Sequence, residues 1–151
     1  MDAAPLFPYR AVRVASWNVN SAKARLDHII DWFADDKADV LLLQEIKSQN
    51  ENFPHDVFID KGWHVAVHGQ KSYNGVAIVS HYPIEDVIFG LPGNDDDEQA
   101  RYIEATITGT RVASIYLPNG NPAPGPKFDY KLDWMERLYV RSQALLADEI
   151  P

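Results

Sequence analysis

The 151-residue sequence contains no cysteine at all. This absence excludes a disulfide framework, a thiolate nucleophile and a zinc site built on cysteine. A chain without thiols suits a reducing cytoplasm, which is the location we expect. No stretch approaches the ~18 consecutive apolar residues of a membrane span, and the acidic, proline-containing start does not have the pattern of a signal peptide. We therefore expect no membrane partner.

Positive charge is also scarce, because 14 Lys and Arg stand against 22 Asp and Glu, a net charge of −8. This balance argues against a protein that holds nucleic acid by bulk positive charge. Several catalytic motifs are missing as well: a glycine-rich phosphate loop, His-Glu-x-x-His and a serine nucleophile elbow. The five histidines show no metal-ligand spacing and are interpreted as structural or exposed.

The first part of the chain has the pattern of a strand, a helix and a second strand. An apolar, partly β-branched segment over 10–19 predicts the first strand, and the run 40–44 predicts a strand covered on both faces, as in parallel sheets. Between them, apolar residues recur at helical spacing: Leu26, Ile29, Ile30 and Phe33. Together these segments predict a βαβ unit and an α/β fold.

The remainder is predicted to hold further strands and one long helix. Extended segments are expected at 63–68, 75–80, 102–107 and 111–116. An acidic loop covers 93–98, and a loop rich in proline and glycine covers 118–126. A helix then runs from about Phe128 to within a residue or two of Pro151, with one stripe formed by Phe128, Leu132, Met135, Leu138, Ser142 and Leu145. This helix either closes a small domain or leads to a following strand, and the pattern favours neither.

Polar residues follow the strands at the positions where open α/β sheets bind ligands. Asn18 ends the first strand and Glu45 follows the second, so the two face one crevice if the strands are neighbours. A carboxylate with an amide oxygen suits Mg²⁺; the alternative, which the local pattern by itself favours, is that Glu45 is a solvated strand-end residue. Tyr116 and Asn119 follow a later strand and could contact a phosphate; alternatively, Tyr116 closes the core. Arg101 could simply pair with the acidic loop: Asp95, Asp96, Asp97 or Glu98.

Six short segments occur in an order that resembles a known family: 16–21, 43–47, 73–78, 101–105, 116–120 and 127–134. They are similar to the N-terminal part of a bacterial exonuclease III, in the abasic-site endonuclease branch of the endonuclease/exonuclease/phosphatase superfamily. The resemblance implies part of a layered α/β sandwich, with a mixed β-sheet and flanking helices. It also implies a Mg²⁺-dependent phosphodiesterase, with Mn²⁺ as the other candidate metal, that acts in base-excision repair on duplex DNA at abasic sites or 3′ ends.

The resemblance assigns roles residue by residue. Glu45 would ligate the metal, Asn18 would help to hold the metal and the scissile phosphate, and Tyr116 would contact the phosphate or assist catalysis. Three residues would face DNA: Arg101, Asn119 and Lys127. We therefore expect residues 12–151 to form the N-terminal part of one such domain, incomplete by itself, after an N-terminal extension over 1–11.

The sequence also departs from the family pattern. Family members continue with a Gly-Asp-(aromatic)-Asn strand, a further Asp and a Ser-Asp-His. In the family, the Asp of that strand and the terminal His orient and activate the attacking water. None is present here, so we expect the 151-residue chain to be inactive or nearly so and to self-associate through exposed sheet surface. The alternatives are a non-catalytic binding module that keeps the scaffold, or a hydrolase of another phosphoester in the superfamily.

Overall fold

The computed structural model describes residues 11–151. The predicted extension over 1–11 lies outside the described residues, apart from residue 11. The described strands are β1 (Val14–Asn18), β2 (Val40–Gln44), β3 (His64–His68), β4 (Val76–Ser80), β5 (Glu85–Phe89), β6 (Tyr102–Ile107) and β7 (Thr110–Ile115). The helices are α1 (Leu26–Ala34), α2 (His55–Ile59) and α3 (Pro126–Ala147), and a 3₁₀ turn covers Asn50–Asn52. Within this part of the chain, no helix is both long and apolar enough to cross a lipid bilayer.

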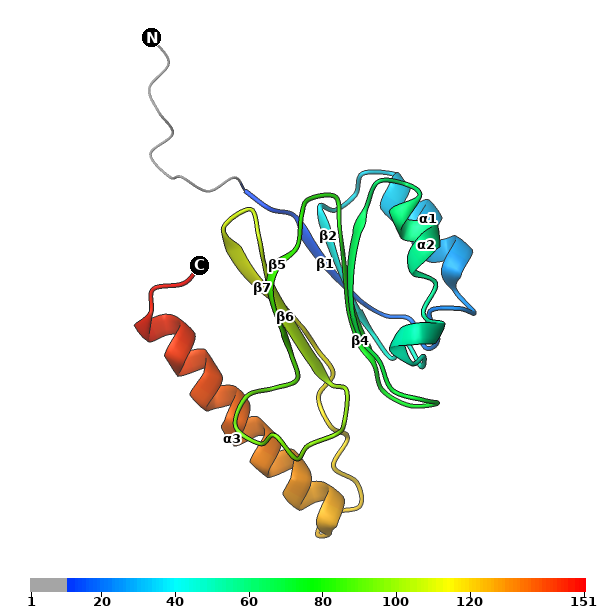
Figure 1. Cartoon of the computed structure of the whole chain (residues 1–151). Helices are drawn as coiled ribbons and strands as arrows, with labels where there is room; N and C mark the ends of the chain where they lie inside the picture. Colours follow the sequence, from blue (N-terminus) through cyan, green and yellow to red (C-terminus); the bar gives the residue numbers. More distant parts are fainter. Residues whose placement is uncertain (1–10) are drawn as a thin grey trace.

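The strands form two sheets that lie face to face (Figure 1). The first sheet has the order β1-β2-β4-β3; β1 and β2 are parallel, and the other pairs are antiparallel. The second sheet, β5-β6-β7, is antiparallel throughout. Helices α1 and α2 cover the outer face of the first sheet, and α3 covers the outer face of the second. The predicted βαβ unit and the layered, mixed α/β fold are thereby confirmed.

Strand β2 shows why the layers stack in this way. Its five residues are all buried. Because side chains alternate along a strand, Leu41 and Leu43 pack toward α1, whereas Val40 and Leu42 pack toward the second sheet. The continuous apolar run 40–44 is therefore covered on both faces, as predicted, by helices on one side and by a second sheet on the other.

Buried polar contacts also join the two sheets. The side-chain amide of Gln44 donates to Ser114 Oγ at 3.1 Å, and the Ser114 hydroxyl donates to the carbonyl of Leu43 at 2.8 Å. Gln44 ends β2 and Ser114 lies on β7, so these bonds cross the interface between the sheets. Since both side chains are buried, breaking this pairing would leave polar groups unsatisfied inside the molecule. The bonds consequently fix the position of one sheet on the other.

Two elements do not follow from the sequence pattern. Strand β5 was not predicted, because a bulge between Glu85 and Ile88 and a positive φ of 51° at Asp86 interrupt the alternation that marks a strand. Helix α2 has only five residues, which is too short for a helical period to be visible.

Helix α3 differs from the prediction in its end and in its buried face. It begins at Pro126 and ends at Ala147, four residues before the last residue. The predicted stripe is partly wrong, because Leu132 and Met135 are 50% and 46% exposed. The face that contacts the second sheet and the loop before β6 instead includes Tyr130, Trp134, Arg137, Leu138 and Arg141. Charged residues lie on the buried face because they pair with the carboxylates of Asp97 and Glu104, so apolar spacing alone misidentified that face.

Candidate active site

The candidate site lies at the C-terminal ends of β1 and β2, where the chain leaves each strand and enters a loop. Backbone hydrogen bonds tie the two turns together, from Val19 N–H to the Gln44 carbonyl at 3.0 Å and from Ser21 N–H to the Glu45 carbonyl at 2.8 Å. On the other side, the Ile46 and Lys47 N–H groups donate to the loop before β4. Glu45 has a φ of 53°, a conformation that costs a non-glycine residue roughly 1–2 kcal/mol. The surrounding bonds therefore hold Glu45 in a backbone conformation that it would not adopt alone.

Glu45 is in direct contact with Tyr116. The Tyr116 hydroxyl donates a short hydrogen bond to Glu45 Oε1, although the two residues are 71 positions apart in the sequence. Burial raises the pKa of Tyr116, and the hydrogen bond to Glu45 raises it further, so the hydroxyl remains a donor near neutral pH. Among residues 11–151, no group donates a hydrogen bond to the other oxygen, Glu45 Oε2. The contact thus leaves one carboxylate oxygen available to a ligand.

Asn18 lies at the neighbouring strand end. It pairs in register with Gln44, one residue before Glu45. Its side-chain Oδ1 accepts a hydrogen bond from the Asn20 N–H at 3.2 Å, and the residue is exposed. The structure therefore places Asn18 beside Glu45 along the sheet edge, as expected, but with its amide turned toward its own loop rather than bonded to Glu45 or Tyr116.

These donors fit a hard divalent cation only in part. Mg²⁺ takes oxygen ligands, keeps several waters and is commonly held by one or two carboxylates. Glu45 supplies one carboxylate, and Asn18 could supply an amide oxygen. No group of three or more His, Cys, Asp or Glu side chains that could hold a metal occurs in the part of the chain that the structure describes. The residues present thus suit a Mg²⁺ ion that keeps most of its water, and they do not suit zinc.

The three predicted DNA-facing residues lie around one groove. Arg101, Asn119 and Lys127 all line a groove of about 640 Å³, together with Tyr130 and the exposed Tyr73. Arg101 directly precedes β6, Asn119 lies in the loop 118–126 and Lys127 lies at the start of α3, so the fold brings together positions far apart in the sequence. Because the Arg101 guanidinium lies 5.0 Å from the centroid of the Tyr116 ring, this groove adjoins the Glu45–Tyr116 pair.

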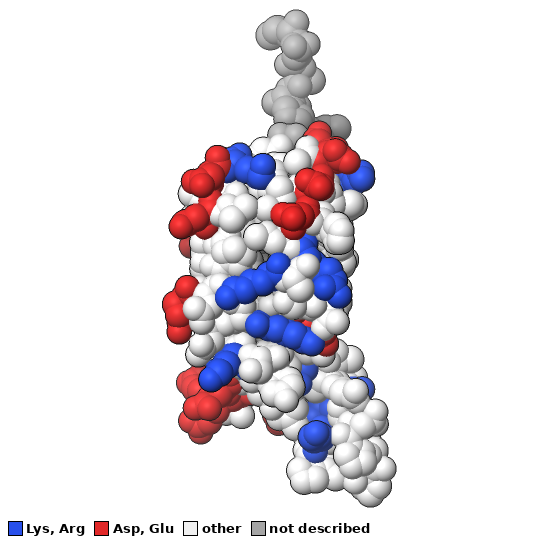
Figure 2. Space-filling model, turned by 90° about the vertical axis from the view of Figure 1, so that its right-hand side faces the viewer, with Lys and Arg blue, Asp and Glu red and all other residues white. Residues whose placement is uncertain are grey.

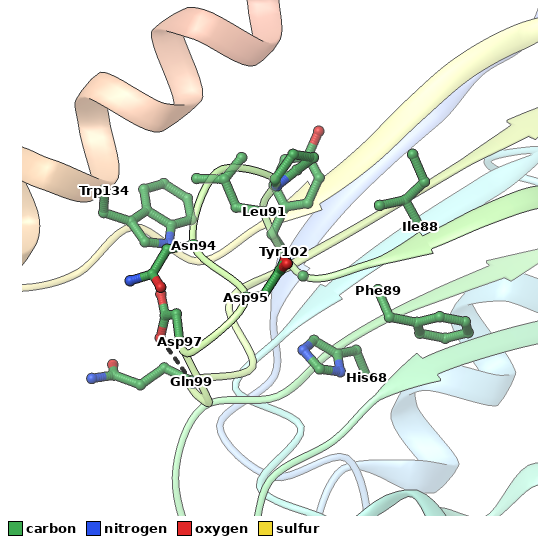
Figure 3. Close-up of a pocket in the computed structure, with 12 residues that line it drawn as sticks. His68, Ile88, Phe89, Leu91, Asn94, Asp95, Asp97, Gln99, Tyr102 and Trp134 are labelled. Atoms are coloured by element: carbon green, nitrogen blue, oxygen red, sulfur yellow. Dashed lines mark hydrogen bonds between the residues drawn. The ribbon is translucent and has the colours of Figure 1, made fainter.

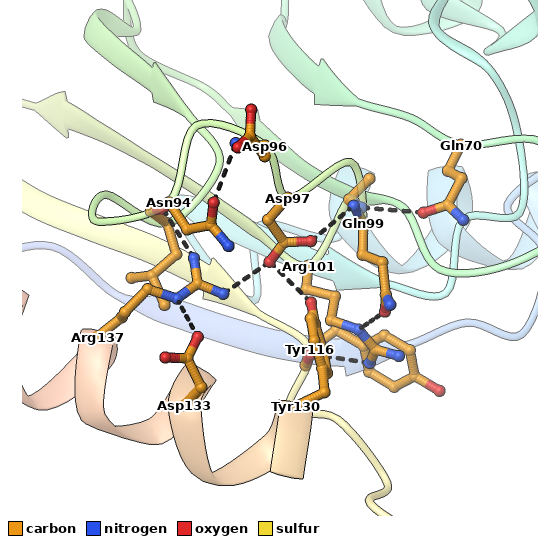
Figure 4. A network of polar contacts seen from close by, with 12 residues as sticks. Gln70, Asn94, Asp96, Asp97, Gln99, Arg101, Tyr116, Tyr130, Asp133 and Arg137 are labelled. Carbon is orange, nitrogen blue, oxygen red and sulfur yellow. Dashed lines mark hydrogen bonds and ion pairs between the residues drawn. The ribbon is translucent and has the colours of Figure 1, made fainter. Parts of the chain in front are cut away.

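Arg101 does not pair with the acidic loop, the alternative considered for it. Its Nε donates to Gln99 Oε1 at 2.8 Å and its Nη1 to the carbonyl of Tyr116 at 3.3 Å. Asp97 of that loop is instead bonded to Arg137 at 2.7 Å. Figure 4 shows Arg101 beside Tyr116 and Tyr130, with the Asp97–Arg137 pair to their left.

Sequence reasoning missed the polar network formed by Asp97, Tyr130 and Arg137. The Tyr130 hydroxyl donates to Asp97 Oδ2 at 2.9 Å, and Arg137 also contacts Asp133 at 3.2 Å. Burial alone would raise the pKa of Asp97, but the hydrogen bonds from Arg137, the Gln99 backbone and Tyr130 outweigh it and lower that pKa. The available signal was the spacing of Tyr130, Trp134, Arg137 and Arg141, which follows one helical face.

A second, smaller pocket shares Asp97 with this network (Figure 3). It measures about 310 Å³ and is lined by residues that include His68, Asp97, Tyr102 and Trp134. Burial lowers the pKa of His68, so the imidazole is neutral near neutral pH. None of the six predicted site residues lines this pocket.

Charge is distributed unevenly over the surface. Figure 2 shows Lys and Arg side chains crossing the middle of the face that carries α1 and α2, with Asp and Glu gathered toward its upper part and its lower left. Near the site, Lys47 Nζ donates to Asn20 Oδ1 at 2.5 Å. The net charge of −8 is therefore compatible with local regions of positive charge.

The chain is similar to several known proteins. The sequence profile of the Endonuclease/Exonuclease/phosphatase family matches residues 15–149. An exodeoxyribonuclease III from Haemophilus influenzae is 33% identical over 146 residues, which is 91% of this chain and 52% of that protein. A 3′ phosphatase, NExo, from Neisseria, solved with a product DNA hairpin, is 44% identical with a TM-score of 0.84, covering 89% of this chain and 53% of the other.

An AP endonuclease from Archaeoglobus fulgidus is 43% identical, with a TM-score of 0.80 over 85% of this chain and 50% of that protein. The chain therefore spans about half the length of each of these relatives.

Proposed function

Since the chain belongs to the endonuclease/exonuclease/phosphatase family, we propose that it carries part of the active site of a DNA-repair nuclease. The substrate is duplex DNA with abasic sites or 3′ ends, and the reaction is phosphodiester hydrolysis with Mg²⁺ or Mn²⁺. One observation above all supports this proposal: the Glu45–Tyr116 hydrogen bond, with the Arg101 guanidinium against the same tyrosine ring. This arrangement combines a carboxylate for a metal, a hydroxyl donor and a fixed cation beside a groove.

Each group has a distinct task in the proposed reaction. Glu45 and the Asn18 amide would hold the metal, which when bound neutralises charge on the phosphate. With substrate bound, the Tyr116 hydroxyl would redirect its single donated hydrogen bond from Glu45 to a phosphate oxygen, and Arg101 would offset the negative charge that accumulates there. Asn119 and Lys127 would contact the DNA backbone along the groove, since such contacts orient a duplex without reading its sequence.

The proposed site has no general base among the described residues. Neither a histidine nor a second carboxylate contacts Glu45 or Tyr116 in the range 11–151, and hydrolysis needs an oriented, activated water as well as charge neutralisation. We therefore propose that the 151-residue chain binds metal and DNA weakly and turns over little or no substrate by itself.

The DNA-binding part of the proposal predicts the effect of removing groove cations. Arg101→Ala and Lys127→Ala should each weaken binding of a duplex with an abasic-site analogue by about threefold to tenfold and lower the salt dependence by roughly one charge. Fluorescence anisotropy over a range of salt concentrations measures both effects. Lys61→Ala is the matched control, since Lys61 is exposed and does not line the groove. An equal loss of binding in the control would contradict this assignment of the groove.

The metal part of the proposal predicts that Glu45→Gln weakens Mg²⁺ binding by about tenfold or more, because the amide removes the only charged oxygen ligand proposed here. The affinity for Mg²⁺ is measured by its competition with Mn²⁺, and Mn²⁺ binding is monitored by electron paramagnetic resonance. Glu51→Gln, at an exposed position in the 3₁₀ turn, is the control. If both variants bind Mn²⁺ as tightly as the original chain, Glu45 is not a ligand.

Turnover distinguishes the remaining possibilities. The chain is incubated with Mg²⁺ and an abasic-site duplex, a phosphoinositide or sphingomyelin. Robust cleavage of the duplex that is lost in Glu45→Gln would show that the chain is catalytically complete and would overturn the proposed partial site. Cleavage of one of the lipids instead would redirect the proposal to another phosphoester.

A further inference from the structure

The Arg101 guanidinium contacts two aromatic rings that come from different parts of the chain. The guanidinium carbon lies 5.0 Å from the centroid of the Tyr116 ring, after β7, and 6.0 Å from that of the Tyr130 ring, in the first turns of α3. A guanidinium over an aromatic face is attracted by the ring quadrupole. Two such contacts restrict a long side chain that would otherwise be flexible.

The hydrogen bonds that Arg101 makes leave some of its guanidinium N–H groups available to a ligand. Nε donates to Gln99 and Nη1 donates to the carbonyl of Tyr116. No hydrogen bond from Nη2 to any residue in the range 11–151 is present. Because Arg101 lines the groove, a phosphate oxygen there could accept from the remaining N–H groups without displacing the bonds that hold the side chain.

Tyr130 is itself fixed by a buried ion pair. Its hydroxyl donates to Asp97 Oδ2 at 2.9 Å, and the same oxygen accepts from Arg137 Nη2 at 2.7 Å. Arg137 is 8% exposed and its neighbour Trp134 is 1% exposed, so both belong to the packed face of α3. Burial and the Asp97 carboxylate raise the pKa of Tyr130 to about 12, and its hydroxyl therefore remains a donor near neutral pH.

These contacts form a continuous path from the helix to the site. Arg137 holds Asp97, Asp97 holds the Tyr130 hydroxyl, and the Tyr130 ring lies against Arg101. Arg101 in turn lies against Tyr116, which donates to Glu45. The path links α3, which packs on the second sheet, to the carboxylate at the edge of the first sheet.

From this geometry we propose that Tyr130 is a positioning residue, which holds the Arg101 guanidinium against Tyr116 so that its remaining N–H groups face a DNA phosphate in the groove. This inference rests on the proposed function and adds to it a residue that need not touch DNA itself. The hydrogen bond from the Tyr130 hydroxyl to Asp97 fixes the position of the Tyr130 ring, and contact with that ring fixes the position of the Arg101 guanidinium.

The test uses three variants of the 151-residue chain: Tyr130→Ala, Tyr130→Phe and, as a control, Tyr139→Ala. Tyr139 lies on the same helix, is 58% exposed and contacts Gln143 rather than Arg101. The first readout is the side-chain Nε–Hε signal of Arg101 in ¹H–¹⁵N spectra, assigned from Arg101→Lys. The second is the affinity for the abasic-site duplex by anisotropy.

The proposal expects Tyr130→Ala to shift the Arg101 signal and to weaken DNA binding by about threefold to tenfold. Tyr130→Phe keeps the ring but loses the bond to Asp97, so it should also shift the signal, with a loss of binding of at most about threefold. Tyr139→Ala should change neither readout.

An Arg101 signal that moves no more in Tyr130→Ala than in Tyr139→Ala would overturn the inference. If Tyr130→Ala fails to fold, the shift of the Arg101 signal in Tyr130→Phe is compared with that in Tyr139→Ala instead. An equal or smaller shift in Tyr130→Phe would overturn the inference. If the original chain does not bind DNA, the proposed function fails, and the spectra still decide whether Tyr130 positions Arg101.

Discussion

Glu104→Gln should lower the free energy of unfolding by about 3–5 kcal/mol at neutral pH, one of the two largest effects expected for this chain. Glu104 on β6 is fully buried. Its carboxylate accepts from Arg111 Nε at 2.5 Å, Arg141 Nε at 2.7 Å and the Tyr102 hydroxyl at 2.9 Å. A neutral amide of the same shape leaves the charges of two largely buried arginines uncompensated, and breaking a buried ion pair in this way is strongly destabilising.

Acid should reduce this difference. Burial alone would raise the pKa of Glu104, but the hydrogen bonds from Arg141 and Arg111 outweigh it and lower that pKa below the ordinary 4.5. A carboxylate with a lowered pKa stabilises the fold above its unfolded pKa, and this stabilisation is lost as the pH falls through the folded value. Urea unfolding at about pH 7 and about pH 3 measures the change.

Glu136→Gln, at an exposed position on α3, is the control for Glu104 and should change stability by less than about 0.5 kcal/mol. If Glu104→Gln remained equally destabilised at both pH values, its effect would come from packing rather than from charge.

Trp134→Ala should also cost about 3–5 kcal/mol, for a different reason. Trp134 is 1% exposed and packs with Leu91 and Tyr102, which are buried as well, between α3 and the second sheet. Removing the indole leaves a cavity at the centre of this contact, and the surrounding chain can fill it only in part. Because Tyr130 lies one turn earlier on the same face, we also expect weaker binding of the abasic-site duplex.

Leu132→Ala provides the matched control for Trp134, since Leu132 is on the same helix but 50% exposed. Its unfolding free energy, measured by urea denaturation, should stay within about 1 kcal/mol of the original value. A similar loss in both variants would mean that α3 is stabilised by its outer face, contrary to the packing described.

The sequence predicted the first half of the fold better than the second. The run 40–44 identified β2, and its position after one helix made β1 a parallel neighbour, so Asn18 and Glu45 could be placed at one sheet edge. Helix α3 was predicted, but its buried face was not, because arginines that pair with buried carboxylates occupy positions where an apolar pattern is expected. Strand β5 is irregular and gave no alternating signal.

Individual residues of the site could be predicted from the sequence, but the way in which they contact one another could not. Glu45 and Tyr116 were each singled out by following a strand, yet their hydrogen bond depends on how two separate sheets stack, which no local pattern reports. For the same reason, Asp97 and Tyr130 were not recognised. Each has an unremarkable local sequence context and gains its importance only from partners about 30–40 positions away, as tertiary contacts commonly require.

The Gln44–Ser114 bonds across the two sheets have a consequence for folding. They lie within two residues of Glu45 on one sheet and of Tyr116 on the other. Sliding one sheet over the other by a single residue would both break these bonds and separate the carboxylate from the phenol. Correct alignment of the sheets and assembly of the site are consequently one event. A collapsed form with all its helices and strands but the wrong alignment would have the secondary structure of the native protein and no site.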